Sequence, residues 1–171
     1  AIGNIAADEE TLPDVVLYVE DLFARDVLTS FYQKFADEQF PDPTTRPTTK
    51  IVPVGGFDAV VAFLERNRSV LPDHVGQKAV LDGDVATDTL NAWRANNNHV
   101  QLAKHQRLHQ DIKYLPFAPE VGLMNYIVNN LQLFEQSLRQ RCADNQIRIR
   151  PLAQKYDASL TGAEQRSAAK K

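Results

Sequence analysis

The chain has 171 residues, a net charge of −3, 43% hydrophobic and 24% charged residues, and a mean hydropathy of −0.36. These values are typical of one soluble globular domain with its own core, and no apolar run reaches the roughly 20 residues of a membrane-spanning helix. The acidic balance excludes a protein that coats nucleic acid by bulk charge, but it is compatible with a local grip on phosphate through metal ions.

The cysteine content and the first residues bear on the compartment. Cys142 is the single cysteine, so an internal disulfide is excluded and a reducing cytoplasm is favoured. Residues 1–10 have neither the basic start nor the apolar centre of a secretory signal peptide. We therefore expect a cytoplasmic protein with no membrane partner, in which residues 1–13 form a linker.

Four apolar runs predict short strands, and no two of them are joined by a hairpin turn. They lie at 14–19, 50–54, 78–82 and 112–117. Pro53 indicates that the second strand lies at an edge or ends irregularly. Helical patterns separate the strands, and this order favours a parallel sheet with right-handed crossovers. We expect an α/β, Rossmann-like fold with a short parallel sheet of about four strands and helices on both faces.

Apolar spacing also predicts where the helices lie. Phenylalanines and a valine recur every fourth residue over 22–38, at Phe23, Val27, Phe31 and Phe35, which predicts a helix with one apolar face. The polar stretch 87–110 is expected to be helical with a break at its three consecutive asparagines. Pro119 begins the best amphipathic pattern of the chain, a helix over 119–142, and a weakly helical tail follows at 151–171.

Acidic or glycine residues follow each predicted strand at its carboxyl end: Glu20 and Asp21, Gly55 and Gly56, Asp82 and Asp84, and Glu120. Parallel strands deliver these ends to one edge of the sheet, which is where open α/β folds bind ligands. If the backbone stays extended after the third strand, Asp82 and Asp84 project to the same side. The sequence therefore predicts a cluster of carboxylates at this edge.

Gathered carboxylates repel one another, so they must take up protons or hold cations. A ligand set of oxygen atoms, with no cysteine or histidine, suits Mg²⁺ or Mn²⁺, and such ions commonly serve phosphoryl transfer. Backbone N–H groups of Gly55 and Gly56 are expected to add to the electropositive mouth. The alternative for "DGD" is a turn that ends a strand, and Asp21 and Glu120 are also favoured by a helix N-terminus alone.

These residues, in this order, resemble a TOPRIM domain, the catalytic fold of topoisomerases, primases and some nucleases. The family pattern is a Glu after the first strand, a glycine-bearing turn, and an Asp-x-Asp after a later strand. Here these are Glu20 in "LYVED", the glycines in "PVGGFDAV", and Asp82 and Asp84 in "LDGD".

The closer similarity is to the C-terminal nuclease domain of the overcoming-lysogenisation-defect (OLD) family of ATP-dependent endonucleases. It includes "VGGFDAVVAFLERN" and "YLPFAPEVGL", which gives Glu120 the position of an additional active-site acid. The resemblance covers roughly residues 14–140 and implies a catalytic domain over 14–150, with 151–171 as its tail.

Two departures from the OLD pattern concern the site. The family's second acid, four residues after the first Glu, is replaced by Ala24, and Asp21 or Asp26 can substitute for it. The family also uses a late lysine, for which the sequence leaves Lys155, Lys170 and Lys171 open. No G-x-x-x-x-G-K-[ST] motif occurs, so the ABC-type ATPase that the resemblance implies is absent from these 171 residues.

The resemblance implies a Mg²⁺- or Mn²⁺-dependent DNA endonuclease, part of an ATPase–nuclease system for defence against phage. Asp82 and Asp84 would hold one or two ions, Glu20 would be a further ligand or the general base, and Glu120 a second acid. DNA and the ATPase are the expected partners, and a homo-oligomer is possible. The substrate strand and the sequence preference are left open.

Two other functions compete with the nuclease. "VVLYVED" and "VLD" also resemble a phosphoacceptor receiver domain, in which Asp82 alone would be phosphorylated, although "KYLPFAPE" lacks the Ser or Thr that a receiver needs. The second is a non-catalytic TOPRIM-like docking module, supported by the helices predicted over 22–38 and 119–142.

The histidines and arginines have a simple interpretation. His105 and His109 are four residues apart, but flanking Lys104 and Arg107 indicate a solvated, DNA-facing helix surface rather than a zinc site. A later basic segment either contacts a nucleic-acid backbone or stabilises a helix end: Arg139, Arg141, Arg148 and Arg150.

Overall fold

The computed structural model describes residues 12–141 and 149–170. The chain forms two compact units, the first ending at Pro116 and the second beginning at Phe117. Each unit is described by itself.

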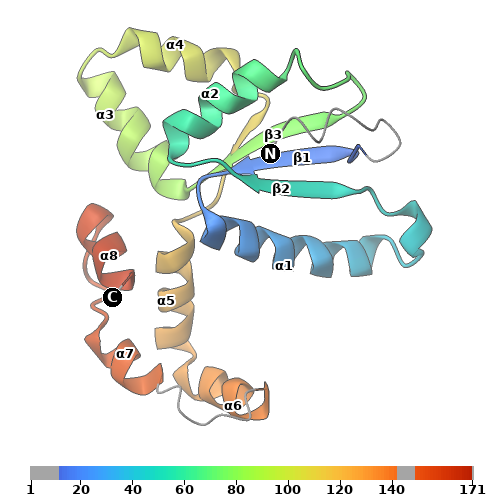
Figure 1. Ribbon diagram of the computed structural model, residues 1–171. Helices are drawn as coiled ribbons and strands as arrows, with labels where there is room; N and C mark the ends of the chain where they lie inside the picture. Colours follow the sequence, from blue (N-terminus) through green and yellow to red (C-terminus); the bar gives the residue numbers. More distant parts are fainter. Residues whose placement is uncertain (1–11, 142–148, 171) are drawn as a thin grey trace. The chain divides into compact units, whose positions relative to one another are not determined.

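The first unit contains a four-stranded sheet in which every neighbouring pair is parallel (Figure 1). Its strands are β1 (Val15–Val19), β2 (Thr49–Pro53), β3 (Gly76–Leu81) and β4 (Ile112–Tyr114), in the order β2-β1-β3-β4. The predicted α/β fold with a parallel sheet is confirmed. β2 is an edge strand that ends at Pro53, as expected. The fourth strand is shorter than predicted, since Leu115 makes a last bond to Leu81 and Pro116 has no N–H to continue the ladder.

Helices cover both faces of the sheet. Figure 1 shows α1 (Leu22–Gln39) on one face and α2 (Phe57–Asn67) on the other. A short 3-10 helix, η2 (Pro43–Thr45), precedes β2. After β3 the chain forms a π-helix, η3 (Val85–Thr89), and then α3 (Leu90–Ala95) and α4 (His99–Arg107). The predicted break at the asparagines is confirmed, because Asn97 has a φ of 52° and the Asn98 side chain caps α4.

The main core lies between the sheet and α2. Alternate residues of the central strands, such as Val16 and Leu81, point toward Val60, Val61 and Leu64 of α2, and all five are at most 1% exposed. Each such side chain stabilises the fold by about 1.5–3 kcal/mol through burial. This packing fixes the carboxyl ends of β1 and β3 side by side.

The α1 face is covered less completely. The helix forms as predicted, but its buried residues are Ala24 and Ala36, while Phe31 and Phe35 are 62% and 53% exposed. The expected apolar face is therefore only partly buried. The reason is length: α1 has 18 residues and is about 27 Å long, whereas the five residues of β1 span only about 17 Å.

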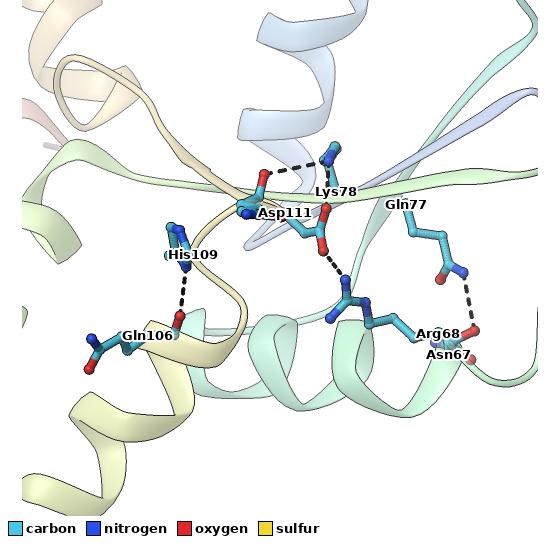
Figure 2. Close-up of polar contacts among 8 residues, drawn as sticks. Asn67, Arg68, Gln77, Lys78, Gln106, His109 and Asp111 are labelled. Atoms are coloured by element: carbon cyan, nitrogen blue, oxygen red, sulfur yellow. Dashed lines mark hydrogen bonds and ion pairs between the residues drawn. The ribbon is translucent and has the colours of Figure 1, made fainter. Parts of the chain in front are cut away.

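Asp111, in the turn before β4, joins two neighbouring elements (Figure 2). Its carboxylate accepts a hydrogen bond from Lys78 Nζ of β3 at 2.5 Å and another from Arg68 at the end of α2. Only 13% of the Asp111 side chain is exposed, and the Lys78 hydrogen bond lowers the pKa of this carboxyl. Gln77 of β3 also donates to the Asn67 carbonyl at 3.2 Å (Figure 2). These contacts hold α2 and β4 against β3.

The second unit is helical. It contains α5 (Pro119–Asn129), α6 (Leu131–Arg141), α7 (Ile149–Lys155) and α8 (Gly162–Ala169), and α5 contacts each of the other three. The single helix predicted over 119–142 is wrong, because the chain breaks at Asn130, whose backbone leaves helical angles. Tyr156 donates a hydrogen bond to Asn125 at 3.0 Å and so links α5 to the segment after α7. Among the described helices, none is both long and apolar enough to cross a membrane.

Candidate active site

The carboxyl ends of β1 and β3 form the point where the topology of the sheet reverses. From β1 the chain crosses to β2 on one side, and from β3 it crosses to β4 on the other. A crevice at such a point is the usual ligand site of an open α/β sheet. Glu20 directly follows β1, and Asp82 directly follows β3.

Glu20 and Asp82 are in contact across this point. The Asp82 N–H donates to Glu20 Oε1 with an N···O distance of 3.0 Å. Glu20 is half-buried, and burial raises the pKa of its carboxyl, an effect that the negative charges of Asp84 and Asp21 increase. Hydrogen bonds from the N–H groups of Asp82 and Phe57 oppose the rise in pKa. Both charges that act on Glu20 are thus negative, which favours a bound cation or proton.

Asp84 lies in a helical turn and not in extended chain. Its φ and ψ are −69° and −23°, and the Val85 N–H donates to the Asp82 carbonyl at 3.1 Å. The expectation that Asp82 and Asp84 project to one side through strand alternation is therefore wrong, because alternation requires extended backbone. The π-helix η3 begins directly after Asp84. Such one-turn π segments occur frequently at functional sites.

The two glycines after β2 differ in role. Gly55 has a φ of +132°, a conformation that favours glycine, and its N–H donates to the Glu20 backbone carbonyl at 3.0 Å. This N–H is engaged within the protein, so the expectation that it serves a ligand is wrong. Gly56 is the N-cap residue of α2, and a Cβ built there meets nothing within 4 Å. The N–H of Phe57, which the sequence did not single out, opposes the rise in the pKa of the Glu20 carboxyl.

Asp21 and Asp26, the possible substitutes for the family's second acid, both have other partners in the structure. Asp21 caps α1, since its side chain accepts from the Ala24 N–H at 2.8 Å. Asp26 is exposed and pairs with Arg25 at 2.8 Å. Ala24 itself is 2% exposed, so an acid at that position would be buried in the α1 packing.

Glu120 belongs to the second unit, in the first turn of α5. Its carboxylate pairs with Lys170 at 2.8 Å, and its side chain is 14% exposed against 59% for Lys170. Lys170, one of the lysines left open by the sequence, is therefore joined to a predicted site residue. Lys155 ends α7, and Lys171 lies outside the described residues.

The helix that contains His105, α4, does not present this histidine to solvent as predicted. His105 is 5% exposed, and its ring contacts Trp93 edge-on at 5.1 Å. Lys104 and Arg107 both pair with Glu65, at 3.8 and 2.9 Å, so these charges hold α4 to α2. α4 ends at Arg107, and His109 lies beyond it, exposed and bonded to the Gln106 carbonyl (Figure 2).

The later arginines have structural partners in part. Arg150 of α7 makes two hydrogen bonds to Glu135 of α6, at 3.1 and 2.8 Å. Arg139 and Arg141 lie in the last turn of α6, where positive charge is favourable. Arg148 falls outside the described residues.

The carboxylate edge fits a divalent cation in charge and in donor type. The available donors are carboxylate oxygens, which Mg²⁺ and Mn²⁺ prefer. Within residues 12–141 and 149–170, no three acidic, histidine or cysteine side chains lie close enough to surround one ion. Mg²⁺ does not need such a cage, because it commonly keeps several waters and takes one or two carboxylates together with substrate phosphate.

No protein-family model matches the chain, and no curated protein or solved structure is significantly similar to it.

Proposed function

We propose that the protein is a metal-dependent nuclease of TOPRIM and OLD type. The observation that carries this proposal is the contact between Glu20 and the Asp82 N–H at 3.0 Å, at the topological switch point, with Asp84 close enough to act on Glu20 electrostatically. Glu20, Asp82 and Asp84 follow the ends of two adjacent strands, and carboxylates are the ligands that hold Mg²⁺ or Mn²⁺ for phosphodiester hydrolysis.

In this mechanism Asp82 and Asp84 would hold the cation, and Glu20 would act as the general base for the attacking water. A bound Mg²⁺ or Mn²⁺ would supply Lewis-acid stabilisation of the negative charge that develops on the phosphate. Glu20 accepts a proton from the attacking water, and a carboxyl whose pKa is raised by burial is better matched to this task near neutral pH. The Asp82 N–H orients the Glu20 carboxylate through its hydrogen bond at 3.0 Å.

The OLD resemblance extends the proposal to partners. DNA is the substrate, an ABC-type ATPase domain or subunit controls cutting in defence against phage, and the cytoplasm is the location. Glu120 and Lys170, which pair with one another, are the proposed additional acid and late lysine. This part depends on analogy with the family and not on the contacts of the sheet edge.

Plasmid cleavage tests the proposal directly. The natural chain is incubated with Mg²⁺ or Mn²⁺, beside an EDTA control and the Asp82→Asn/Asp84→Asn double variant. Metal-dependent nicking that disappears in both controls supports the nuclease. A chain that binds no Mn²⁺ by calorimetry and cuts no plasmid is not a nuclease. A chain that takes up phosphate from a small phosphodonor on Asp82, with or without Asp84, is a receiver.

A second candidate is a docking module, and the exposure of the α1 aromatic residues favours it. Phe31 and Phe35 are more than half exposed on the same face of α1, which is unusual for large apolar side chains of a helix packed on a sheet. A docking function predicts that Phe31→Ala/Phe35→Ala abolishes partner capture while metal binding is unaffected. If the protein is a nuclease, the same variant should still cut DNA.

A further inference from the structure

Four ring-bearing side chains gather beside the carboxylate edge, and we call them the aromatic cluster: Phe57, Trp93, His105 and Tyr114. Phe57 and Trp93 have ring centroids 5.6 Å apart, and Trp93 meets His105 edge-on at 5.1 Å. His105 Nδ1 lies 3.4 Å from the Tyr114 hydroxyl. These residues come from α2, α3, α4 and β4, so four elements converge here.

Two residues of the aromatic cluster lie near the carboxylates. Phe57 begins α2, its N–H opposes the rise in the pKa of the Glu20 carboxyl, and its ring centroid lies 5.6 Å from that of Trp93. Tyr114 is the register partner of Leu81, the residue before Asp82, and the next residue of the chain bonds to the Leu81 carbonyl at 2.8 Å. Adjacent strands lie about 4.8 Å apart, so Tyr114 is a near neighbour of the Asp82 backbone.

The cluster is partly open to solvent and carries a cation. Tyr114 is 36% exposed, and Trp93 and Phe57 are half-buried. Arg94 directly follows Trp93, is exposed, and donates to the Asn91 side chain at 2.7 Å. Burial raises the pKa of the Tyr114 hydroxyl, and the positive charge of Arg94 opposes this rise. An aromatic surface with an arginine is the combination that single-stranded nucleic acid uses, because bases stack on rings and phosphates pair with cations.

His105 is the buried member of the aromatic cluster. It is 5% exposed, and its Nε2 has no hydrogen-bond partner in the part of the chain that the structure describes. Burial lowers the pKa of this imidazole, and its Nδ1 lies 3.4 Å from the Tyr114 hydroxyl. His105 is thus a positioning residue for the exposed Tyr114 ring.

We propose that Tyr114, Trp93 and Arg94 form a subsite for an unpaired nucleotide next to the bond that is cut. The rings stack on the base, and Arg94 pairs with a phosphate that the neighbouring carboxylates would otherwise repel. A paired base inside a duplex cannot offer its face in this way, so single-stranded DNA is the preferred ligand. This inference rests on the proposed nuclease function and specifies its substrate class.

Trp93 is the single tryptophan of the chain, so its fluorescence reports on this subsite. The full chain in EDTA is titrated with a single-stranded thymidine oligonucleotide of about ten residues, long enough for such a surface, and with a blunt duplex. We expect the Trp93 emission to change on saturation with the single strand, and the duplex to bind more weakly. Tyr114→Ala and Arg94→Ala should each weaken binding at least about fivefold.

Matched variants separate stacking from general damage. Tyr114→Phe keeps the ring and should bind within about twofold of the natural chain. Val70→Ala and Arg66→Ala remove an exposed apolar side chain and an exposed arginine elsewhere in the first unit and should leave binding unchanged. Thermal unfolding of each variant shows whether it is folded.

The outcomes distinguish this inference from the nuclease proposal. The subsite is overturned by unchanged Trp93 emission, by absence of binding, or by folded Tyr114→Ala and Arg94→Ala variants that bind like the natural chain, even if plasmid cleavage by the carboxylates is established. Binding that follows the expected pattern without any metal-dependent cleavage keeps the subsite and overturns the nuclease.

Discussion

The backbone N–H of Asp82 donates a hydrogen bond to the carboxylate of Glu20, 3.0 Å away across the junction of β1 and β3. The two residues are 62 positions apart in sequence and meet only because β1 and β3 are parallel neighbours. Glu20 is held half-buried beside further negative charge, an arrangement that costs stability and is maintained by the surrounding sheet. Because the Glu20 charge costs stability, replacing it tests whether Glu20 serves the fold or the function.

Glu20→Gln is expected to abolish cleavage and to stabilise the fold at pH 7. Gln keeps an oxygen that can accept from the Asp82 N–H but carries no charge. Because burial raises the pKa of Glu20, the charged form is disfavoured in the folded state, and this penalty is present at pH values above the folded pKa. Removing the buried charge should add about 0.5–2 kcal/mol to the free energy of unfolding, measured with urea at pH 7.

The stability difference must also depend on pH in one direction. As the pH falls toward the ordinary glutamate pKa, Glu20 takes up a proton in the folded state and its penalty disappears. The gain from Glu20→Gln should therefore shrink between pH 7 and about pH 4.5. A variant that is less stable than the natural chain at pH 7 would show that the Glu20 charge has a structural role.

Asp84→Asn is expected to lower the pKa of Glu20, because after burial the negative charge of Asp84 contributes most to its rise. Titration of the Glu20 side-chain carboxyl by ¹³C NMR measures this shift without any substrate. Asp88→Asn is the matched control, since Asp88 is an exposed acid four residues further along. Equal pKa shifts in both variants would mean that Asp84 has no specific proximity to Glu20. The proposed cation site at Asp82 and Asp84 would then lose its electrostatic support.

The sequence predicted the sheet and the edge because strand patterns and the β-α-β order are local signals. Glu20 and Asp82 could be expected to meet, since parallel strands end at a common edge. The turn into helix at Asp84 could not be foreseen, because "DGD" is compatible with extended and helical backbone. The break at Asn130 is a similar case, since the apolar pattern continues on both sides of it.

His105 shows a different limit of sequence reasoning. Its polar neighbours Lys104 and Arg107 suggested solvent, yet both pair with Glu65 of α2, and this pairing turns His105 inward. Only the tertiary position of α2 decides which side of α4 is buried. The signal that could have found the aromatic cluster was the placement of Phe57 at the start of the helix after β2 and of Tyr114 at the end of β4.

His105 is expected to make stability fall below neutral pH. Burial lowers the pKa of this imidazole. The negative charge of Asp58 opposes this effect, and the positive charge of Lys104 adds to it, both by smaller amounts. The unfolded chain therefore binds a proton more readily, and stability is lost as the pH falls through about 6.5 toward the folded pKa. Urea unfolding of His105→Phe, which keeps a ring, should show a flatter dependence between about pH 7 and 5. An unchanged slope, with His109→Gln as the control, would contradict this assignment.

Asp111→Asn is expected to loosen the junction of α2, β3 and β4. The variant keeps the shape of the side chain but weakens its bonds to Lys78 and Arg68. We expect a loss of about 1 kcal/mol in the free energy of unfolding at pH 7, a modest value because Arg68 is half exposed.

The pH dependence of this effect has a defined sign. The Lys78 hydrogen bond lowers the pKa of Asp111, so its contribution is present above the ordinary aspartate pKa and is lost as the pH falls through the folded value. The natural chain and Asp111→Asn should thus converge in stability in strong acid. Asp73→Asn, at an exposed position in the same unit, serves as the control.

Lys170→Ala tests which late lysine takes part in cleavage. Lys170 is 59% exposed, so its pair with Glu120 should contribute no more than about 1 kcal/mol to stability. If the pair serves the proposed nuclease, Lys170→Ala lowers the cleavage rate at least about tenfold, the scale of losing one charge in the transition state, whereas Lys155→Ala has no effect. Lys170→Arg keeps the charge and should restore part of the rate. Full activity in Lys170→Ala would instead show that the ion pair only holds α8 against α5, and the late lysine of the OLD pattern would have to lie elsewhere.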